Sequence, residues 1–162
     1  MSKTKKVLKR FSLLREYTVL SDVKVMVEGQ EHTFDKLLIG CFGILSLVTF
    51  DKKGELFGNE HDDCFILLTK NKTRREKTEN LIKKVQKDEL VLRKILSDNE
   101  IYKIKIDTGI VIENAFCNAM IANDIVPVYT PQTLKKQLNC GKYDMDYKIN
   151  VDAIVNAINK AK

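Results

Sequence analysis

The sequence predicts a mixed α/β (α+β) fold, with one mixed β-sheet and flanking helices in a single domain over residues 1–162. Three observations support this class. Strand patterns fill the first third of the chain, a basic stretch with helical periodicity follows, and a short apolar run bounded by glycine and asparagine comes after it. A strand, a helix and a second strand in this order are the building unit of sheets covered by helices.

The amino-terminal part of the chain predicts a helix followed by a three-stranded meander. Within the basic segment 1–16, a helix is expected over residues 5–16, because Val7, Leu8, Phe11 and Leu14 recur at helical spacing. The three strands are expected at residues 17–27, 32–40 and 43–50. The last two are apolar on both sides, which is typical of strands in the middle of a covered sheet.

The rest of the predicted core, residues 17–140, is dominated by one long helix. This helix is expected from Arg74 to Leu96, because apolar residues recur within it at helical spacing and the lysines fall on the opposite side. The smaller elements expected are a strand at 55–57, a strand or buried loop at 62–69, strands at 110–112 and 125–129, a helix at 130–138 and a carboxy-terminal helix at 150–160. Pro127 places the strand at 125–129 at an edge of the sheet.

The stretch from Thr33 to Gly58 decides the functional interpretation. Asp35 opens an apolar run, a Gly-Cys-Phe-Gly turn reverses it, and a second apolar run ends in Asp-Lys-Lys-Gly at 51–54. This layout resembles the core of the nuclease-related domain (NERD) family, a branch of the restriction-endonuclease-like superfamily. The resemblance extends from about Thr18 to Leu138.

In that family, an Asp before one strand and an acid-x-Lys on the next hold a divalent metal and activate water. When the chain is aligned on Gly43 and Gly54, the acid falls on Val48 and the lysine on Phe50. The glutamate of the family's first helix has only Glu16 as a counterpart, without the preceding glycine. The resemblance therefore implies a nuclease fold that has lost its catalytic residues, with no metal and no cofactor.

Three functions remain open on these residues. The first is a pseudoenzyme that binds nucleic acid or a nucleic-acid-processing protein; relatives lie beside DNA-processing modules and on mobile genetic elements, which implies a regulator or inhibitor. The second is an active Mg²⁺-dependent nuclease that uses Asp35, Asp51 and Lys53, since the last two keep the acid-x-lysine spacing. The third is a homodimeric scaffold, joined through an apolar stripe at Val151, Ile154, Val155 and Ile158.

The charge of the chain is concentrated in two segments. The segment from Met1 to Lys24 contains seven basic and two acidic residues, and the segment from Lys70 to Lys94 contains ten basic and four acidic residues. The net charge of the whole chain is +6. Clustered cations of this kind are the electrostatic pattern of proteins that bind phosphate backbones. The candidate nucleic-acid-binding residues are Lys5, Lys6, Lys9, Arg10, Arg74, Arg75, Lys83, Lys84 and Lys87.

Composition also bears on location and on metal binding. The longest apolar run, residues 37–50, is shorter than the roughly 20 residues of a membrane-spanning helix. The amino terminus lacks the apolar segment of a secretory signal, so a cytoplasmic protein is expected. The four cysteines form no C-x-x-C pair, which predicts reduced thiols, with Cys41 and Cys117 buried, and no zinc site.

Overall fold

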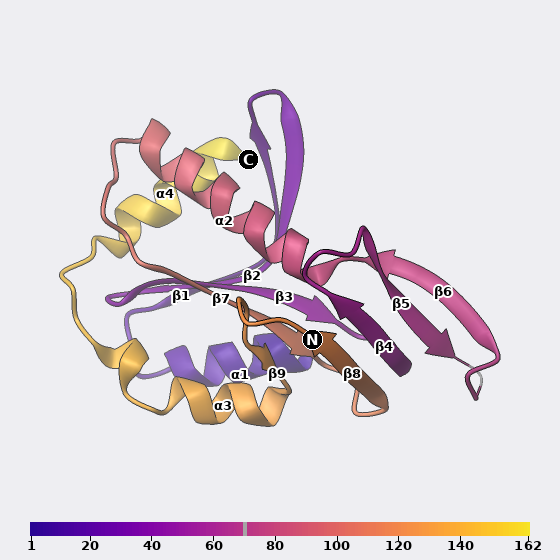
Figure 1. Ribbon diagram of the computed structural model, residues 1–162. Helices are drawn as coiled ribbons and strands as arrows, with labels where there is room; N and C mark the ends of the chain where they lie inside the picture. The colour runs from indigo at the N-terminus through magenta and orange to yellow at the C-terminus, as the bar shows by residue number, and fades with distance from the viewer. Residues whose placement is uncertain (70) are drawn as a thin grey trace.

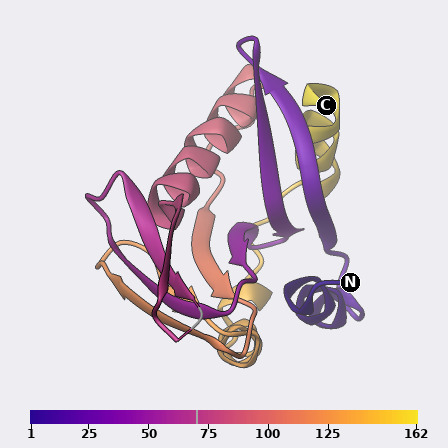
Figure 2. The same cartoon turned by 90° about the vertical axis from the view of Figure 1, so that its right-hand side faces the viewer.

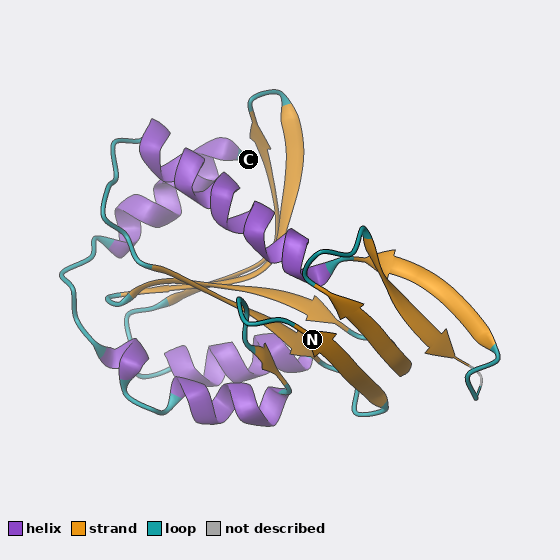
Figure 3. Cartoon of the chain, in the orientation of Figure 1, coloured by secondary structure: helices purple, strands orange, loops and turns teal. Residues whose placement is uncertain are grey.

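The computed structural model describes residues 1–69 and 71–162, and Lys70, the first cation of the second basic segment, lies outside them. The described chain forms two mixed sheets and four α-helices (Figure 1, Figure 3). The helices are α1 (Lys3–Ser12), α2 (Leu81–Asp98), α3 (Pro131–Leu138) and α4 (Val151–Ala161). The strands are β1 (Thr18–Val27), β2 (Gln30–Gly40), β3 (Gly43–Phe50), β4 (Gly54–Asn59), β5 (Cys64–Thr69), β6 (Arg74–Glu79), β7 (Ile106–Ile112), β8 (Cys117–Ala122) and β9 (Val128–Tyr129).

The first sheet, sheet A, has the order β1-β2-β3-β7-β9. Its first three strands form the antiparallel meander that the sequence predicts. Strand β3 then pairs in parallel with β7, and α2 lies in the connection between them, so the expected crossover is confirmed. Strand β9 is at the edge, as predicted, but it is shorter than the expected 125–129 and begins only after Pro127. Thr130 and Pro131 begin α3, and the Thr130 hydroxyl accepts the Thr133 N–H.

The second sheet, sheet B, has the order β6-β5-β4-β8 and extends sheet A around a bend. The parallel pair β3 and β7 continues as the parallel pair β4 and β8. Two backbone bonds hold the bend, from the Glu113 N–H to the Phe50 oxygen at 2.8 Å and from the Gly54 N–H to the Phe116 oxygen at 3.0 Å. Strand β8 and the division into two sheets were not predicted, because its residues have no distinctive period.

Two predicted helix boundaries are wrong. Residues 74–79 form strand β6, not the first turns of the long helix, because they pair with β5 along their whole length. Helix α2 begins only after Asn80, whose side-chain oxygen accepts the N–H groups of Ile82 and Lys83 at 2.9 and 3.1 Å. The first helix ends at Ser12. Leu14, expected on its apolar face, is therefore 97% exposed.

Helices cover both faces of sheet A (Figure 1). Helices α2 and α4 pack on one face with β1 and β2, and α1 and α3 pack on the other with β3 and β7. The carboxy-terminal stripe belongs to the first of these cores, where Ile154 and Ile158 are fully buried. It is consequently not available as a dimer interface. The cysteines are free, as predicted, but Cys41 and Cys117 are only half-buried.

Candidate functional site

The two glycines on which the nuclease-like hairpin aligns have backbone conformations that favour glycine. Gly43 has φ of +125° and Gly54 has φ of +130°. A Cβ atom would lie 2.3 Å from the Lys105 oxygen in the first case and 2.4 Å from the Leu68 oxygen in the second. Both contacts are with backbone, which cannot move aside. The positions of these two glycines, which define the spacing of the hairpin, are therefore fixed by backbone conformation and by close backbone contacts.

Asp35 closes the end of the hairpin. Its Oδ2 atom accepts the N–H of Thr49 at 2.9 Å. The ladder between β2 and β3 ends at the pair Lys36 and Leu47, so no strand backbone on the β2 side accepts that N–H. The carboxylate takes the place of the missing strand partner. This role needs no metal.

Replacing Asp35 with alanine is expected to lower the free energy of unfolding by about 1–3 kcal/mol, because the Thr49 N–H then has no acceptor. Asp35→Asn keeps an acceptor oxygen and should lose less. Urea denaturation of the two variants and the wild type measures both effects. An Asp35→Ala protein with wild-type stability would show that this hydrogen bond is not what the carboxylate contributes.

The family's acid and lysine positions lie in the hydrophobic core. Val48 is 2% exposed and Phe50 is 6% exposed. They pack under the first turns of α2, against Leu81 and Ile82, and against apolar residues of sheet B. Beside them β3 pairs with β7 in an unbroken ladder. Neither position faces a cleft where a metal or a substrate could bind.

The alternative catalytic set does not assemble either. Asp51 and Lys53 are exposed in the turn between β3 and β4. By the register, Asp35 lies opposite Val48, three residues before Asp51, or about 10 Å along the strand. No group of three His, Cys, Asp or Glu side chains in the described residues could hold a metal ion. The residues present therefore do not fit the divalent metal that the fold implies, and Glu16 is exposed beyond the end of α1.

A buried charged cluster holds α2 on the first hairpin, and the sequence did not predict it. Asp88 is fully buried, and its Oδ1 atom contacts His32 Nε2 at 2.6 Å and the Lys84 ammonium. Lys84 also donates to the Thr33 oxygen at 2.7 Å. Burial lowers the pKa of His32 to about 4, and the cations of Lys84 and Lys87 add to this effect. The histidine is thus neutral at pH 7 and donates to the carboxylate.

Burial raises the pKa of Asp88 to about 6, although its hydrogen bond from Lys84 acts in the opposite direction. The second oxygen, Oδ2, is buried without a partner. Two features of the sequence could have indicated this cluster. Lys84 and Asp88 are four residues apart on a helix, and His32 lies in a strand of alternating pattern. Lys84, one of the candidate nucleic-acid-binding residues, lies in this cluster with its ammonium bound to Asp88 and Thr33.

The candidate nucleic-acid-binding residues do not form one surface. Those of α1 lie on one side of sheet A, and those of α2 lie on the other (Figure 1). Arg74 and Arg75 are on strand β6 of sheet B. Carboxylates neutralise most of the α2 cations: Lys83 lies 3.9 Å from Asp63, and Lys94 lies 3.0 Å from Asp98. Of the α2 cations, Lys87 is the one without a carboxylate within salt-bridge distance among the described residues.

Helices α1 and α3 form a different surface, the basic groove. Neither helix contains an acidic residue. None of their lysines and arginines lies within salt-bridge distance of a carboxylate in the described residues. Between them is a cavity of about 490 Å³ with an apolar floor that includes Val7 and Leu138. The cations around it are Lys3, Lys6, Arg10, Arg15 and Lys135.

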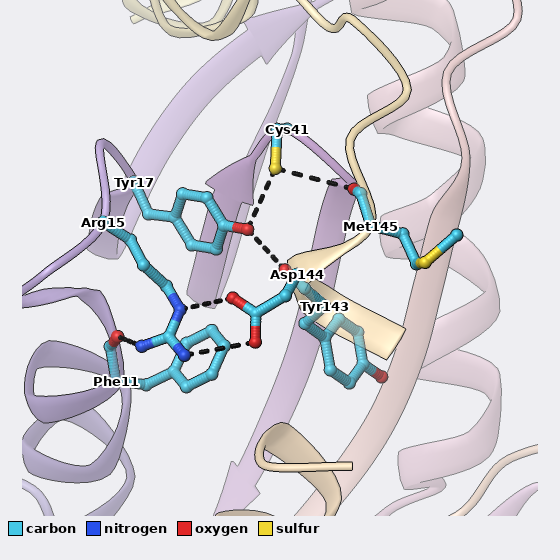
Figure 4. A network of polar contacts seen from close by, with 7 residues as sticks. All are labelled: Phe11, Arg15, Tyr17, Cys41, Tyr143, Asp144 and Met145. Atoms are coloured by element: carbon cyan, nitrogen blue, oxygen red, sulfur yellow. Dashed lines mark hydrogen bonds and ion pairs between the residues drawn. The ribbon is translucent and has the colours of Figure 1, made fainter. Parts of the chain in front are cut away.

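A network at the end of α1 fixes the orientation of this helix (Figure 4). Arg15 donates to both carboxylate oxygens of Asp144, at 2.6 and 3.2 Å, and to the backbone oxygen of Phe11. Its guanidinium also lies 3.8 Å from the centre of the Phe11 ring. Tyr17 donates to the Tyr143 oxygen and contacts the thiol of Cys41. The carboxy-terminal segment thereby holds α1 beside α3.

Comparisons with known proteins agree with the hairpin pattern. A family model described as the nuclease-related domain matches residues 2–113, which are more than two thirds of the chain. Neither the curated proteins nor the solved structures contain a match. In the described part of the chain, no helix combines the length and the apolar character needed to cross a membrane. With its glycine-bounded hairpin, Asp35 and the parallel crossover in place, the chain belongs to the nuclease-related domain family.

Proposed function

We propose that this protein is a nuclease-related domain that binds nucleic acid without cleaving it, and that the basic groove between α1 and α3 is its binding surface. The carrying observation is the charge of these two helices, which together present unpaired cations and no carboxylate. We place this activity in the cytoplasm, where the domain would regulate a protein that acts on DNA.

The absence of catalysis is supported by what occupies the nuclease centre. Hydrolysis of a phosphodiester in this fold needs two carboxylates on a metal ion and a lysine beside the attacking water. Val48 and Phe50 instead complete the core beneath α2. Asp35 remains, but one of its oxygens is used by the Thr49 N–H. A single carboxylate in this position supports the strand and not a metal-bound water.

Binding through the groove is supported by its charge and shape. Lysine and arginine side chains gain most from a polyanion where no neighbouring carboxylate competes for them. The only aromatic ring in the groove, Phe11, is covered by Arg15. The groove therefore contacts phosphates and not bases, and its affinity for nucleic acid should be independent of the nucleotide sequence.

Reversing the charge of the groove with Lys6→Glu, Arg10→Glu and Lys135→Glu together is expected to weaken binding of a duplex of about two helical turns by roughly 100-fold or more. Fluorescence anisotropy measures the affinity. The slope of log K against log salt should be about −3 to −5 for the wild type, since each phosphate contact contributes about −0.9, and nearer to zero for the variant.

The matched control carries the same number of reversals on α2, at Lys83, Lys87 and Lys94. Its affinity for the duplex should change little, because α2 faces away from the groove. Circular dichroism tests whether both triple variants are folded. If the α2 variant loses binding and the groove variant keeps it, the interface lies on the candidate residues of α2 and not in the groove.

The competing nuclease makes a separate forecast. A nuclease would degrade DNA in the presence of Mn²⁺, whereas on our proposal the wild-type protein with Mn²⁺ leaves single-stranded and duplex DNA intact. Cleavage that Asp51→Asn and Lys53→Ala both remove would come from the protein itself and would restore the enzyme, whatever the groove variants show.

A further inference from the structure

The outer face of sheet B is a platform with its own composition. Leu56 and Leu67 are opposite each other and buried on the inner face. Side chains alternate along a strand, so their neighbours point outward. One outward row crosses all four strands and consists of Met120, Phe57, Ile66 and Lys77. The adjacent outward row consists of Asn118, Glu55, Leu68 and Arg75.

The chain itself does not cover this platform. Phe57, Ile66 and Leu68 belong to none of the three hydrophobic cores of the described residues. Figure 2 shows sheet B at the left of the molecule, with α2 over its inner side and no helix over the other. Phe57, Ile66 and Leu68 are partly exposed, and Met120 is 43% exposed. The platform is thus an apolar surface that lacks a partner within the chain.

An exposed aromatic residue borders the platform. Phe116 precedes β8 and is 83% exposed. It lines a hollow of about 770 Å³ together with Lys53, Leu68 and Asn118. A phenyl ring held in solvent beside amide and ammonium groups offers a flat face for a nucleobase and donors for its edge and its phosphate.

The charges of the platform favour an anionic partner. Arg75, Lys77 and Lys53 have no carboxylate within salt-bridge distance among the described residues. Two carboxylates of the strands point to this face: Glu55 is paired with Lys72 at 3.4 Å, and Glu79 lies at the end of β6, in the row beyond Lys77. A second copy of this chain, with its net charge of +6, would bring more cations to the same place. An anionic ligand with flat apolar groups fits both the charge and the aromatic rings.

We infer that the outer face of sheet B binds single-stranded nucleic acid, with bases stacked on Phe116 and Phe57 and phosphates on Arg75, Lys77 and Lys53. This inference rests on the proposed function, because it extends the same ligand to a second surface. The two surfaces adjoin. The backbone N–H of Thr4, at the start of α1, donates to the side chain of Glu113 at 3.4 Å, immediately before the turn that carries Phe116.

A tryptophan placed at this position tests the stacking directly. The sequence contains five tyrosines but no tryptophan, so Phe116→Trp introduces a single tryptophan whose emission can be excited selectively. An oligothymidylate of about twelve nucleotides should quench its emission strongly, because a base would lie against the indole. A duplex of equal length should quench it far less, since its bases are already stacked. Unchanged emission while anisotropy shows that the oligonucleotide is bound would overturn the inference.

Affinity measurements provide the matched controls. Phe116→Ala should weaken binding of the single strand roughly tenfold and leave duplex binding unchanged. Tyr102→Ala, which removes another exposed aromatic ring far from sheet B, should change neither. If polyglutamate alters the indole emission as the oligonucleotide does, the platform takes acidic protein segments and not bases. If neither nucleic acid binds the wild-type protein, the proposed function fails; if both bind and Phe116→Ala has no effect, only this inference fails.

Discussion

Replacing Asp88 with alanine is expected to lower the free energy of unfolding by about 3–5 kcal/mol, which is a large part of the stability of a domain this size. The loss has a specific cause. Lys84 and His32 both direct their donors at the Asp88 carboxylate, and the variant leaves a largely buried ammonium without its counter-charge. Urea denaturation at pH 7 measures the change.

The control is a second carboxylate on the same helix. Asp98 pairs with Lys94 at the same spacing of four residues, but on the surface. Asp98→Ala should lower the free energy of unfolding by less than about 1 kcal/mol. Converting Lys84 to methionine together with Asp88 to leucine should recover part of the loss, because no charge then remains buried. Equal losses for Asp88→Ala and Asp98→Ala would show that the cluster does not hold α2 on the hairpin.

Restoring the family's acid and lysine with Val48→Glu and Phe50→Lys is expected to unfold the domain and not to produce a nuclease. Both side chains would enter the core beneath α2 as charges, where each buried ion costs several kcal/mol, against a total stability of about 5–15 kcal/mol. Far-ultraviolet circular dichroism and a cleavage assay with Mn²⁺ report the two outcomes.

The control for this pair keeps both positions apolar. Val48→Ile with Phe50→Leu changes shape without burying charge, and it should remain folded. A Val48→Glu, Phe50→Lys protein that folds and cleaves DNA would mean that the core can open into a metal site. In that event the packing of α2 over these two positions would be no obstacle to catalysis.

Local sequence signals determined much of the fold. The meander followed from alternating and continuous apolar runs, and the glycines at 43 and 54 marked turns that their φ angles require. The start of α3 followed from Thr130 and Pro131. The alignment on Gly43 and Gly54 also predicted that Val48 and Phe50 occupy the family's acid and lysine positions. These features were predictable because each depends on the residue itself and its close neighbours in the chain.

Other features were decided only by the tertiary structure. Strand β6 has a polar sequence that fits an exposed helix equally well, and its pairing with β5 made it a strand. In the sequence, Lys84 resembles the other lysines of α2. In the structure, its ammonium contacts the buried carboxylate of Asp88, which also contacts His32. The lysines and arginines of α1 and α2 look alike in the sequence, but sheet A separates the two helices and carboxylates neutralise most of the cations of α2. Burial, pairing across a sheet and the neutralisation of charge depend on residues far apart in the chain, so a linear pattern does not contain them.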